Sequence, residues 1–238
     1  MLGNSFSIII MSYLAGLLSL ATPWSINRFL NYMNNLRPIG KFWTPMLNGG
    51  LSIITAHEEK ELEVKSQVFD FLAISDIKKE FDRMFAGKHC LFTCENLSQD
   101  ALQKNMFLVG GPIPNAVTRE VLSNEDIRYY FERNNIKDKM NPDFCKKAVI
   151  ENNIVVRDYG IITKCENPFR QDRSVIIGSG CYGWGTWSAL EALVNPQILQ
   201  FLYGKGDPYF QILVSVNVFR KLPQEPILMG ETYKSIGG

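Results

Sequence analysis

The pattern of hydrophobic and polar positions divides the chain into an apolar front end and a longer region of alternating character. Residues 6–21 are strongly apolar, and no charged residue occurs between residues 2 and 27. From residue 51 onward, short apolar runs alternate with amphipathic segments. We therefore expect an apolar helix over residues 1–30, a Pro- and Gly-containing linker over residues 31–50, and a folded domain over residues 51–238.

The domain is predicted to have an α/β fold. A helix capped by Ser75 is indicated by apolar residues at helical spacing, and further helices are expected after Asn115 and over Thr186–Tyr203. The polar stretch Tyr129–Ile150 predicts a long surface excursion. Alternation of strands and helices favours a mainly parallel sheet with helices on both faces. The predicted strands are Leu51–Ala56, Leu91–Cys94, Met106–Val109, Ile154–Val156, Tyr159–Thr163, Ser174–Ile177, Phe210–Val218 and Ile227–Tyr233.

Composition and charge exclude some classes of protein. The apolar fraction of 46% and a net charge of +1 argue against intrinsic disorder. With 25 basic and 24 acidic residues, the chain has no general attraction for phosphate backbones, so we expect no nucleic-acid partner. The 5 cysteines are irregularly spaced and only 2 histidines are present, so no metal site is predicted. Reduced cysteines indicate a reducing compartment.

The apolar front end has three interpretations. Residues 6–24 are at the short end of the length that can span a bilayer. The basic residues Arg28, Arg37 and Lys41 follow them. The positive-inside rule then leaves the domain in the cytoplasm, attached to the membrane. The alternatives are a cleaved signal peptide ending near Ala21, and a packed helix, through which the chain could form a homo-oligomer in the cytoplasm.

Two glycine-rich segments follow predicted strands, where ligands bind in open parallel sheets. The first contains two glycines, two prolines and an asparagine that could cap a helix or contact a ligand. The second holds a G-x-G-x-x-G pattern between a strand and a helix, and helix amides can hold a phosphate. We therefore expect a small anionic ligand to be held between the two segments, with a nucleotide as the candidate cofactor. The expected ligand-binding residues are Gly110, Gly111, Asn115, Gly178, Gly180, Gly183, Gly185 and Thr186.

Weaker patterns suggest catalysis and electrostatic contacts at the same edge. Asp158 and Asp76 could act as acids or bases, and Cys181 could be a nucleophile with His57 as its base. For each of these four residues a structural role is also open. Tyr182, Trp184 and Trp187 surround the second segment and could stack on a base. The arginines considered as phosphate partners are Arg119, Arg170 and Arg173.

Several motifs in fixed order resemble a poorly characterised prokaryotic α/β domain. They are Gly110-Gly-Pro-x-x-Asn115, Asp158-Tyr-Gly-Ile-Ile162, Asn167-Pro-Phe169 and Gly183-x-Gly-Thr186. Related patterns are similar to those of archaeal S-layer-associated proteins and of bacterial proteins without an assigned role. The resemblance covers roughly residues 50 to 235 and implies a Rossmann-like domain with two facing loops, but no catalytic set.

The sequence therefore favours a domain that binds a nucleotide or another small anionic metabolite and acts as a membrane-tethered sensor or effector. One alternative is a soluble enzyme that hydrolyses nucleotides or glycosides with a carboxylate at the same edge. The other is a structural or assembly module.

Overall fold

The computed structural model describes residues 37–56, 79, 82, 89–123, 127–204 and 209–233. The apolar segment 6–24, the predicted helix after Ser75, His57 and Asp76 lie outside these residues. Within the described ranges, no helix has the length and apolar character needed to cross a bilayer.

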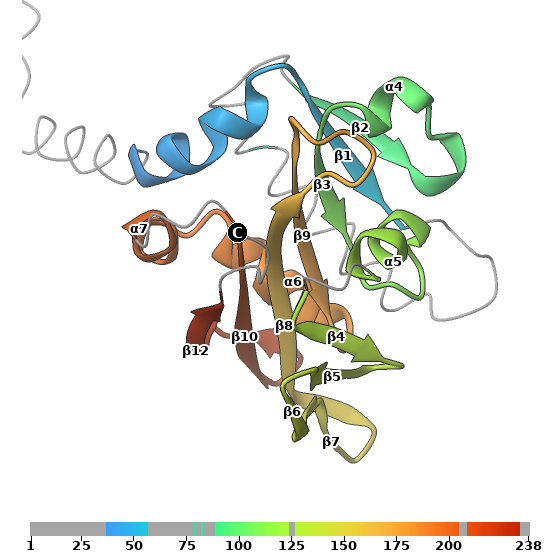
Figure 1. Cartoon of the computed structure of the whole chain (residues 1–238). Coiled ribbons are helices and arrows are strands. Elements are labelled where there is room, and N and C mark those ends of the chain that lie inside the picture. The colour runs from blue at the N-terminus through green and yellow to red at the C-terminus, as the bar shows by residue number, and fades with distance from the viewer. Residues whose placement is uncertain are drawn as a thin grey trace, which may run out of the picture.

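A mixed nine-stranded sheet forms the centre of the described structure (Figure 1). Its parallel half consists of β1 (Leu51–Thr55), β2 (His89–Thr93), β3 (Asn105–Val109) and β9 (Ser174–Gly180). Its antiparallel half consists of β7 (Val149–Glu151), β8 (Ile154–Glu166), β10 (Phe210–Phe219), β11 (Leu222–Pro223) and β12 (Ile227–Tyr233). Strand β8 lies antiparallel to β9 and joins the two halves.

This sheet corrects the prediction of a mainly parallel, Rossmann-like fold with helices on both faces. The apolar strands were predicted at nearly the right positions, but β8 and β10 run antiparallel to their neighbours. Strands covered on both faces read as continuous apolar runs whatever their direction, so the pattern did not reveal this. The predicted pair at 154–156 and 159–163 is one continuous strand, β8.

A second, three-stranded antiparallel sheet replaces the predicted surface excursion. It consists of β4 (Tyr129–Glu132), β5 (Asn135–Asp138) and β6 (Asn141–Lys147). Gln211 on β10 joins it to the large sheet, because its side-chain oxygen accepts from the amide of Tyr129 at 2.7 Å and its side-chain nitrogen donates to the Tyr129 carbonyl at 3.1 Å. Arg128 and Asp138 form a largely buried ion pair beside it.

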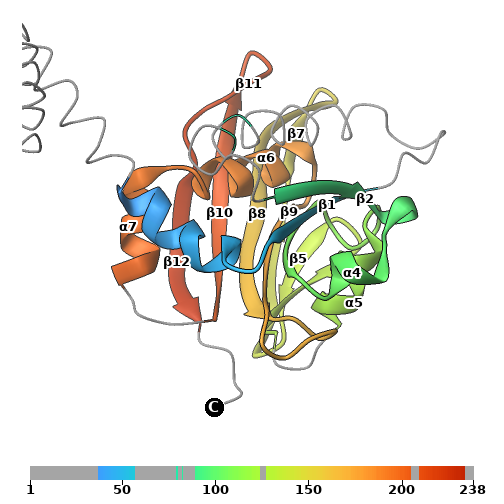
Figure 2. The ribbon, with the colours of Figure 1, turned by 90° about the horizontal axis from the view of Figure 1, so that it is seen from above.

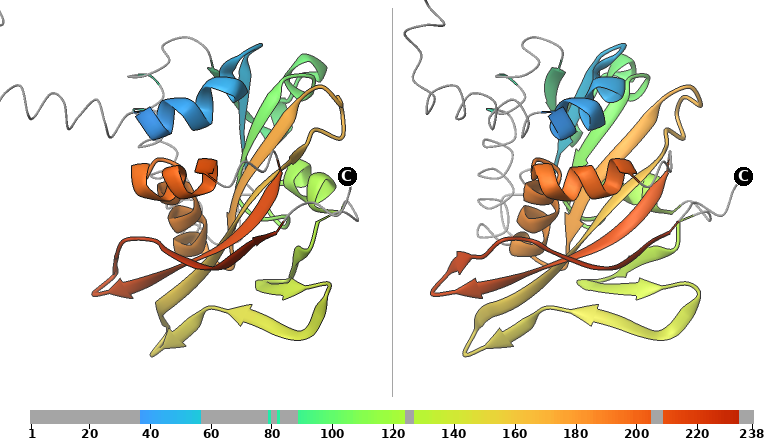
Figure 3. Two further views of the ribbon diagram at one scale, coloured as in Figure 1. Left: turned by 60° about the vertical axis from the view of Figure 1, so that its left-hand side comes forward. Right: turned by 90° about the vertical axis from the view of Figure 1, so that its left-hand side faces the viewer.

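Helices cover one face of the large sheet (Figure 3). They are a helix over residues 37–47, α6 (Gly183–Ala192) and α7 (Pro196–Gly204). The predicted helix over 186–203 is divided into α6 and α7, because Pro196 begins a new helix after Asn195. The other face is covered by α5 (Ala116–Leu122) and by the three-stranded sheet. Two shorter helices, η1 (Cys94–Asn96) and α4 (Gln99–Leu102), connect β2 to β3.

Residues 37–47, in the segment expected to be a linker, form part of the core. Trp43 is fully buried, its ring lies against that of Phe107 with centroids 5.1 Å apart, and its indole nitrogen donates to the Leu193 carbonyl at 2.9 Å. Phe42 and Met46 are buried on the same side of the helix. This segment therefore belongs to the domain that the sequence placed after residue 50.

Candidate functional site

The carboxyl ends of the four parallel strands meet at one edge of the sheet, which we call the carboxyl edge. In the order β8-β9-β3-β1-β2, β1 is followed along the chain by β2 on one side. Strand β3 is followed, after α5 and the three-stranded sheet, by β8 and β9 on the other side. A crevice between two strands whose connections diverge in this way is where open α/β sheets bind ligands. Here that position lies beyond the ends of β1 and β3.

The segment Gly110–Asn115 lies at this divergence, as expected from the sequence. Gly110 has a φ of 97°, which favours glycine, and its amide donates to the carbonyl of Gly178 at 3.0 Å. A Cβ added to Gly111 would lie 3.7 Å from the carbonyl oxygen of Gly180, so this backbone is open to a small side chain. Ile113 is 62% exposed. The first predicted segment is therefore an open loop, and it lies beside the end of β9.

Asn115 fastens this loop to the two diverging strands. Its side-chain nitrogen donates to the carbonyls of Ile54 at 3.3 Å and Val109 at 3.0 Å. Its side-chain oxygen accepts from the amides of Val117 and Thr118, both at 3.1 Å, and so caps α5. Of the two roles considered for this residue, capping is the one observed, and the side chain is fully buried.

Cys94 lies at the same edge and was assigned no role there from the sequence. Its thiol lies 3.0 Å from both the Thr55 carbonyl oxygen and the side-chain oxygen of Asn115. Burial raises the pKa of the Cys94 thiol, although the amides of Ala116 and Val117 oppose that shift. The thiol is thus a hydrogen-bond donor at neutral pH. Its position directly after β2 was the signal that could have placed it at the carboxyl edge.

The second glycine segment is closed by packing rather than open. Strand β9 ends at Gly180, and α6 begins at Gly183 and lies directly against β8 and β9. A Cβ on Gly180 would lie 2.1 Å from the Thr186 amide nitrogen, and one on Gly185 would lie 2.1 Å from the Tyr159 carbonyl oxygen. Gly178 is similarly close to the side chain of Leu190. These glycines therefore permit a close approach of helix and sheet, and Thr186 is buried in the same contact.

Asp158 supplies a negative charge at the start of α6 from within the protein. Its carboxylate accepts from the Gly185 amide at 2.6 Å and from the Tyr159 amide at 2.8 Å, and it is fully buried. Burial raises the pKa of Asp158 to about 6, while the amides of Gly185, Tyr159 and Tyr182 partly oppose that shift. The helix amide that the sequence assigned to a ligand anion is thus bonded to Asp158.

The described catalytic candidates do not form a catalytic set. Asp158 is buried beneath α6 and has no access to a substrate. Cys181 is buried, and desolvation raises the pKa of its thiol to about 12, which disfavours the nucleophilic thiolate. The pairing of Cys181 with His57, and any role of Asp76, lie outside the described residues. Among the described residues, no group of three or more His, Cys, Asp or Glu side chains could hold a metal ion.

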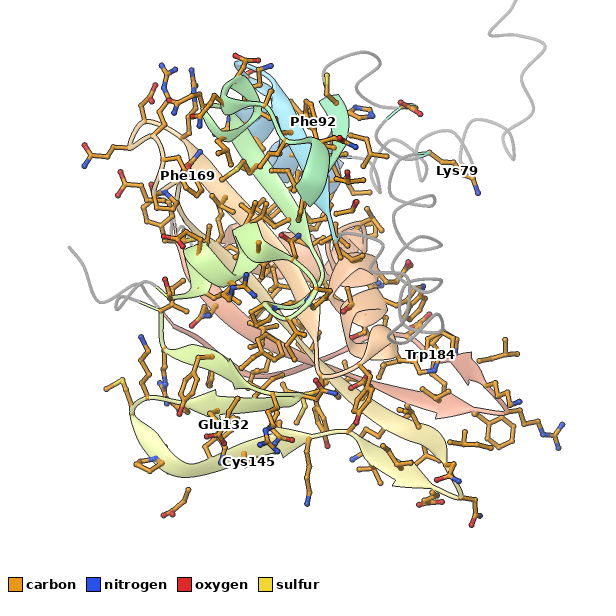
Figure 4. All side chains as sticks on the ribbon, turned by 90° about the vertical axis from the view of Figure 1, so that its right-hand side faces the viewer. Lys79, Phe92, Glu132, Cys145, Phe169 and Trp184 are labelled. Carbon is orange, nitrogen blue, oxygen red and sulfur yellow. The ribbon has the colours of Figure 1, made fainter. Side chains whose placement is uncertain are left out.

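The three arginines separate between the two ends of the sheet. Arg119 lies at the carboxyl edge, where its guanidinium donates to the Pro112 carbonyl at 3.3 Å. Arg170 and Arg173 precede β9 and lie at its opposite end, where Arg170 pairs with Asp172 at 2.6 Å. In Figure 4, Phe169, which precedes β9, and Trp184, which follows it, lie well apart. Arg119 is therefore the one of these three that can contact a ligand at the carboxyl edge.

The motif Asn167-Pro-Phe169 has a structural role at that opposite end. The side-chain nitrogen of Asn167 donates to the carbonyls of Leu102 and Lys104, both at 2.9 Å, and its oxygen accepts from the Phe169 amide at 2.9 Å. This ties the turn before β9 to the start of β3.

Comparison with known proteins adds no relative: no family model matches the chain, and no curated protein matches its sequence. The resemblance to a prokaryotic domain stays a prediction, and the function must be argued from the carboxyl edge itself.

Proposed function

We propose that the protein binds a small anionic metabolite at the carboxyl edge, between the Gly110–Asn115 loop and the turn at residues 181–184. The observation that carries this proposal is the divergence of β1 and β3 beneath an open, glycine-containing loop. A ligand here would lie against the half-buried backbone of Gly111 and Pro112, while Asn115 keeps the loop in place.

The chemistry of this edge favours an anion. The stretch from Gly110 to Arg119 contains no acidic residue, and α5 has none in its first turn. The carboxylate at the start of α6, that of Asp158, is buried and bonded to backbone amides. Arg119 places a guanidinium next to the loop. Tyr182 and Trp184 are half-buried in the turn that follows β9, and a flat base could stack there. These features support a nucleotide or another phosphorylated metabolite as the ligand class.

Binding without catalysis is the form of the proposal that the described residues support. The two described catalytic candidates are buried, and one of them, Asp158, is bonded to the backbone of α6. We further propose that residues 6–24 tether this binding domain to a membrane, as a sensor or effector. Extraction of the full chain that requires detergent, and no longer does when residues 1–30 are deleted, would support the tether. Full solubility without detergent would contradict it.

A thermal-shift screen of nucleotides and sugar phosphates tests the binding site. We expect one class of compound to raise the melting temperature of the wild-type chain, and Gly111→Leu to abolish that shift by filling the space beside Gly180. Gly40→Ala is the matched control, because a Cβ at Gly40 meets nothing within 4 Å. The site is wrong if Gly111→Leu folds and responds like the wild type, and the function is wrong if no compound shifts either protein.

A further inference from the structure

The antiparallel half of the sheet ends in two hairpins that extend past the carboxyl edge. Gly160 of β8 pairs with Gly180, the last residue of β9, so β8 continues beyond β9 from residue 159 back to residue 154. This extension is about 20 Å at a rise of roughly 3.3 Å per residue. Strand β10 runs beside it, with Asn217 paired to Arg157. We call residues 147–157 and 217–225 the hairpin end; both hairpins project from the same end of the sheet (Figures 2 and 3).

Both hairpins are closed by tight two-residue turns. Asn152 and Asn153 have φ values of 49° and 61°, and Arg220 and Lys221 have φ values of 51° and 65°. Positive φ at both central residues defines the turn type that matches the twist of a hairpin. The arginine and lysine occupy a conformation that asparagine and glycine adopt more easily, so local folding does not explain these two basic residues.

Large hydrophobic side chains are exposed on these hairpins. The described residues include ten exposed large hydrophobic side chains, and five of them lie here. Phe219 is 61% exposed and Leu222 is 69% exposed, directly flanking the basic turn. The other three are Val149, Ile150 and Ile154. Apolar side chains gathered at one projecting end indicate an interaction surface.

The hairpin end carries an excess of basic side chains, which favours an anionic partner. It carries four basic side chains, Lys147, Arg157, Arg220 and Lys221, against two acidic ones, Glu151 and Glu225. This excess is larger than the net charge of +1 for the whole chain. The guanidinium of Arg220 lies 5.2 Å from the centre of the Phe219 ring, so charge and apolar surface coincide.

We propose that the hairpin end docks on the surface of an anionic lipid membrane, with Phe219 and Leu222 entering the interface and the basic side chains contacting lipid headgroups. A few projecting apolar side chains flanked by Arg and Lys suit a headgroup layer. Docking would hold the carboxyl edge close to the membrane. It requires neither the ligand nor residues 6–24.

The first test measures how the full chain partitions onto vesicles of phosphatidylcholine, with and without phosphatidylserine. We expect binding only when phosphatidylserine is present. Arg220→Asn with Lys221→Gly removes two charges while favouring the same turn, and we expect partitioning to fall about tenfold or more. Phe219→Ser with Leu222→Ser should cause a similar loss. Leu91→Ser, at a position on β2 that is 49% exposed, is the control and should bind like the wild type.

Hydrogen exchange on the vesicle-bound chain separates the hairpin end from any contact made by residues 6–24. We expect slower amide exchange at residues 149–157 and 217–223 on phosphatidylserine vesicles, and unchanged exchange in β2. The proposal is overturned if the chain does not bind, if bound chain shows no protection at these two segments, or if both hairpin variants bind like the wild type. It is also overturned if the same residues mediate self-association in solution without lipid.

Discussion

The two glycine-rich segments follow neighbouring parallel strands but use their glycines in opposite ways. In Gly110–Asn115 the backbone turns at a positive φ and leaves Gly111 open beside the end of β9. In Gly178–Thr186 the glycines bring α6 into contact with β8 and β9, and a buried carboxylate bonds the helix start. A glycine pattern between a strand and a helix therefore does not distinguish a ligand loop from close packing. The two cases are distinguished by the space around each glycine, that is, by which atoms an added Cβ would contact.

The largest expected difference between the segments is in their tolerance of alanine. Gly185→Ala should lower the free energy of unfolding by about 3 kcal/mol or more, since its Cβ would lie 2.1 Å from the Tyr159 carbonyl oxygen. Gly111→Ala should change it by less than about 0.5 kcal/mol. Urea unfolding of both variants measures this. Equal costs would remove the distinction between a closed and an open segment.

The buried carboxylate of the closed segment should make stability depend on pH. Because the pKa of Asp158 is raised to about 6, its carboxyl group binds a proton more tightly in the folded chain than in the unfolded one. The stabilisation of the folded chain by this tighter proton binding is fully present below about pH 4. It is lost as the pH rises through about 6. Relative to Asp158→Asn, the free energy of unfolding of the wild type should fall by about 2–3 kcal/mol between pH 4 and pH 7.

Unfolding of both proteins as a function of pH measures this loss. Asp172→Asn serves as the control, because Asp172 is exposed and its pKa is lowered by the guanidinium of Arg170. A constant difference between wild type and Asp158→Asn would contradict the role assigned to Asp158.

The open segment depends on Asn115 as a bridge and not only as a helix cap. An aspartate in its place would still accept from the α5 amides, but could not donate to the carbonyls of Ile54 and Val109. We therefore expect Asn115→Asp to cost about 2 kcal/mol, as much as Asn115→Ala. Thermal unfolding distinguishes the two roles, because a residue that only capped α5 would tolerate aspartate.

Much of the fold was predictable from local patterns, while strand direction was not. The apolar runs beginning at Leu51, Met106 and Phe210 are strands in the structure. The direction of β8 depends on hydrogen bonds to β9 and β10, which leave no trace in the sequence of β8 itself. Pro38, Gly40 and Pro45 suggested a linker over residues 31–50. The helical spacing of Ile39, Phe42, Trp43 and Met46 was the stronger signal there, and these side chains are buried in the core.

The sequence predicted that the two glycine segments lie near each other, but not the contacts that each one makes. Strands β3 and β9 pair in parallel, so the meeting of Gly110 with Gly178 follows from that pairing. That Asp158 would occupy the helix amides could not be inferred, because the contact joins residues 27 positions apart through the antiparallel strand β8. Cys94 was missed for a different reason, because it was considered as a possible metal ligand and not by its position at the end of a strand.

The most direct test of the central claim is a structure determined with a ligand identified by the thermal-shift screen. We predict that the ligand contacts the backbone of Gly111 and Pro112, with its anionic group within reach of the Arg119 guanidinium. Asp158 should remain bonded to the Gly185 amide. A ligand bound at the opposite end, beside Arg170 and Arg173, or one that displaces Asp158 to occupy the start of α6, would contradict the account.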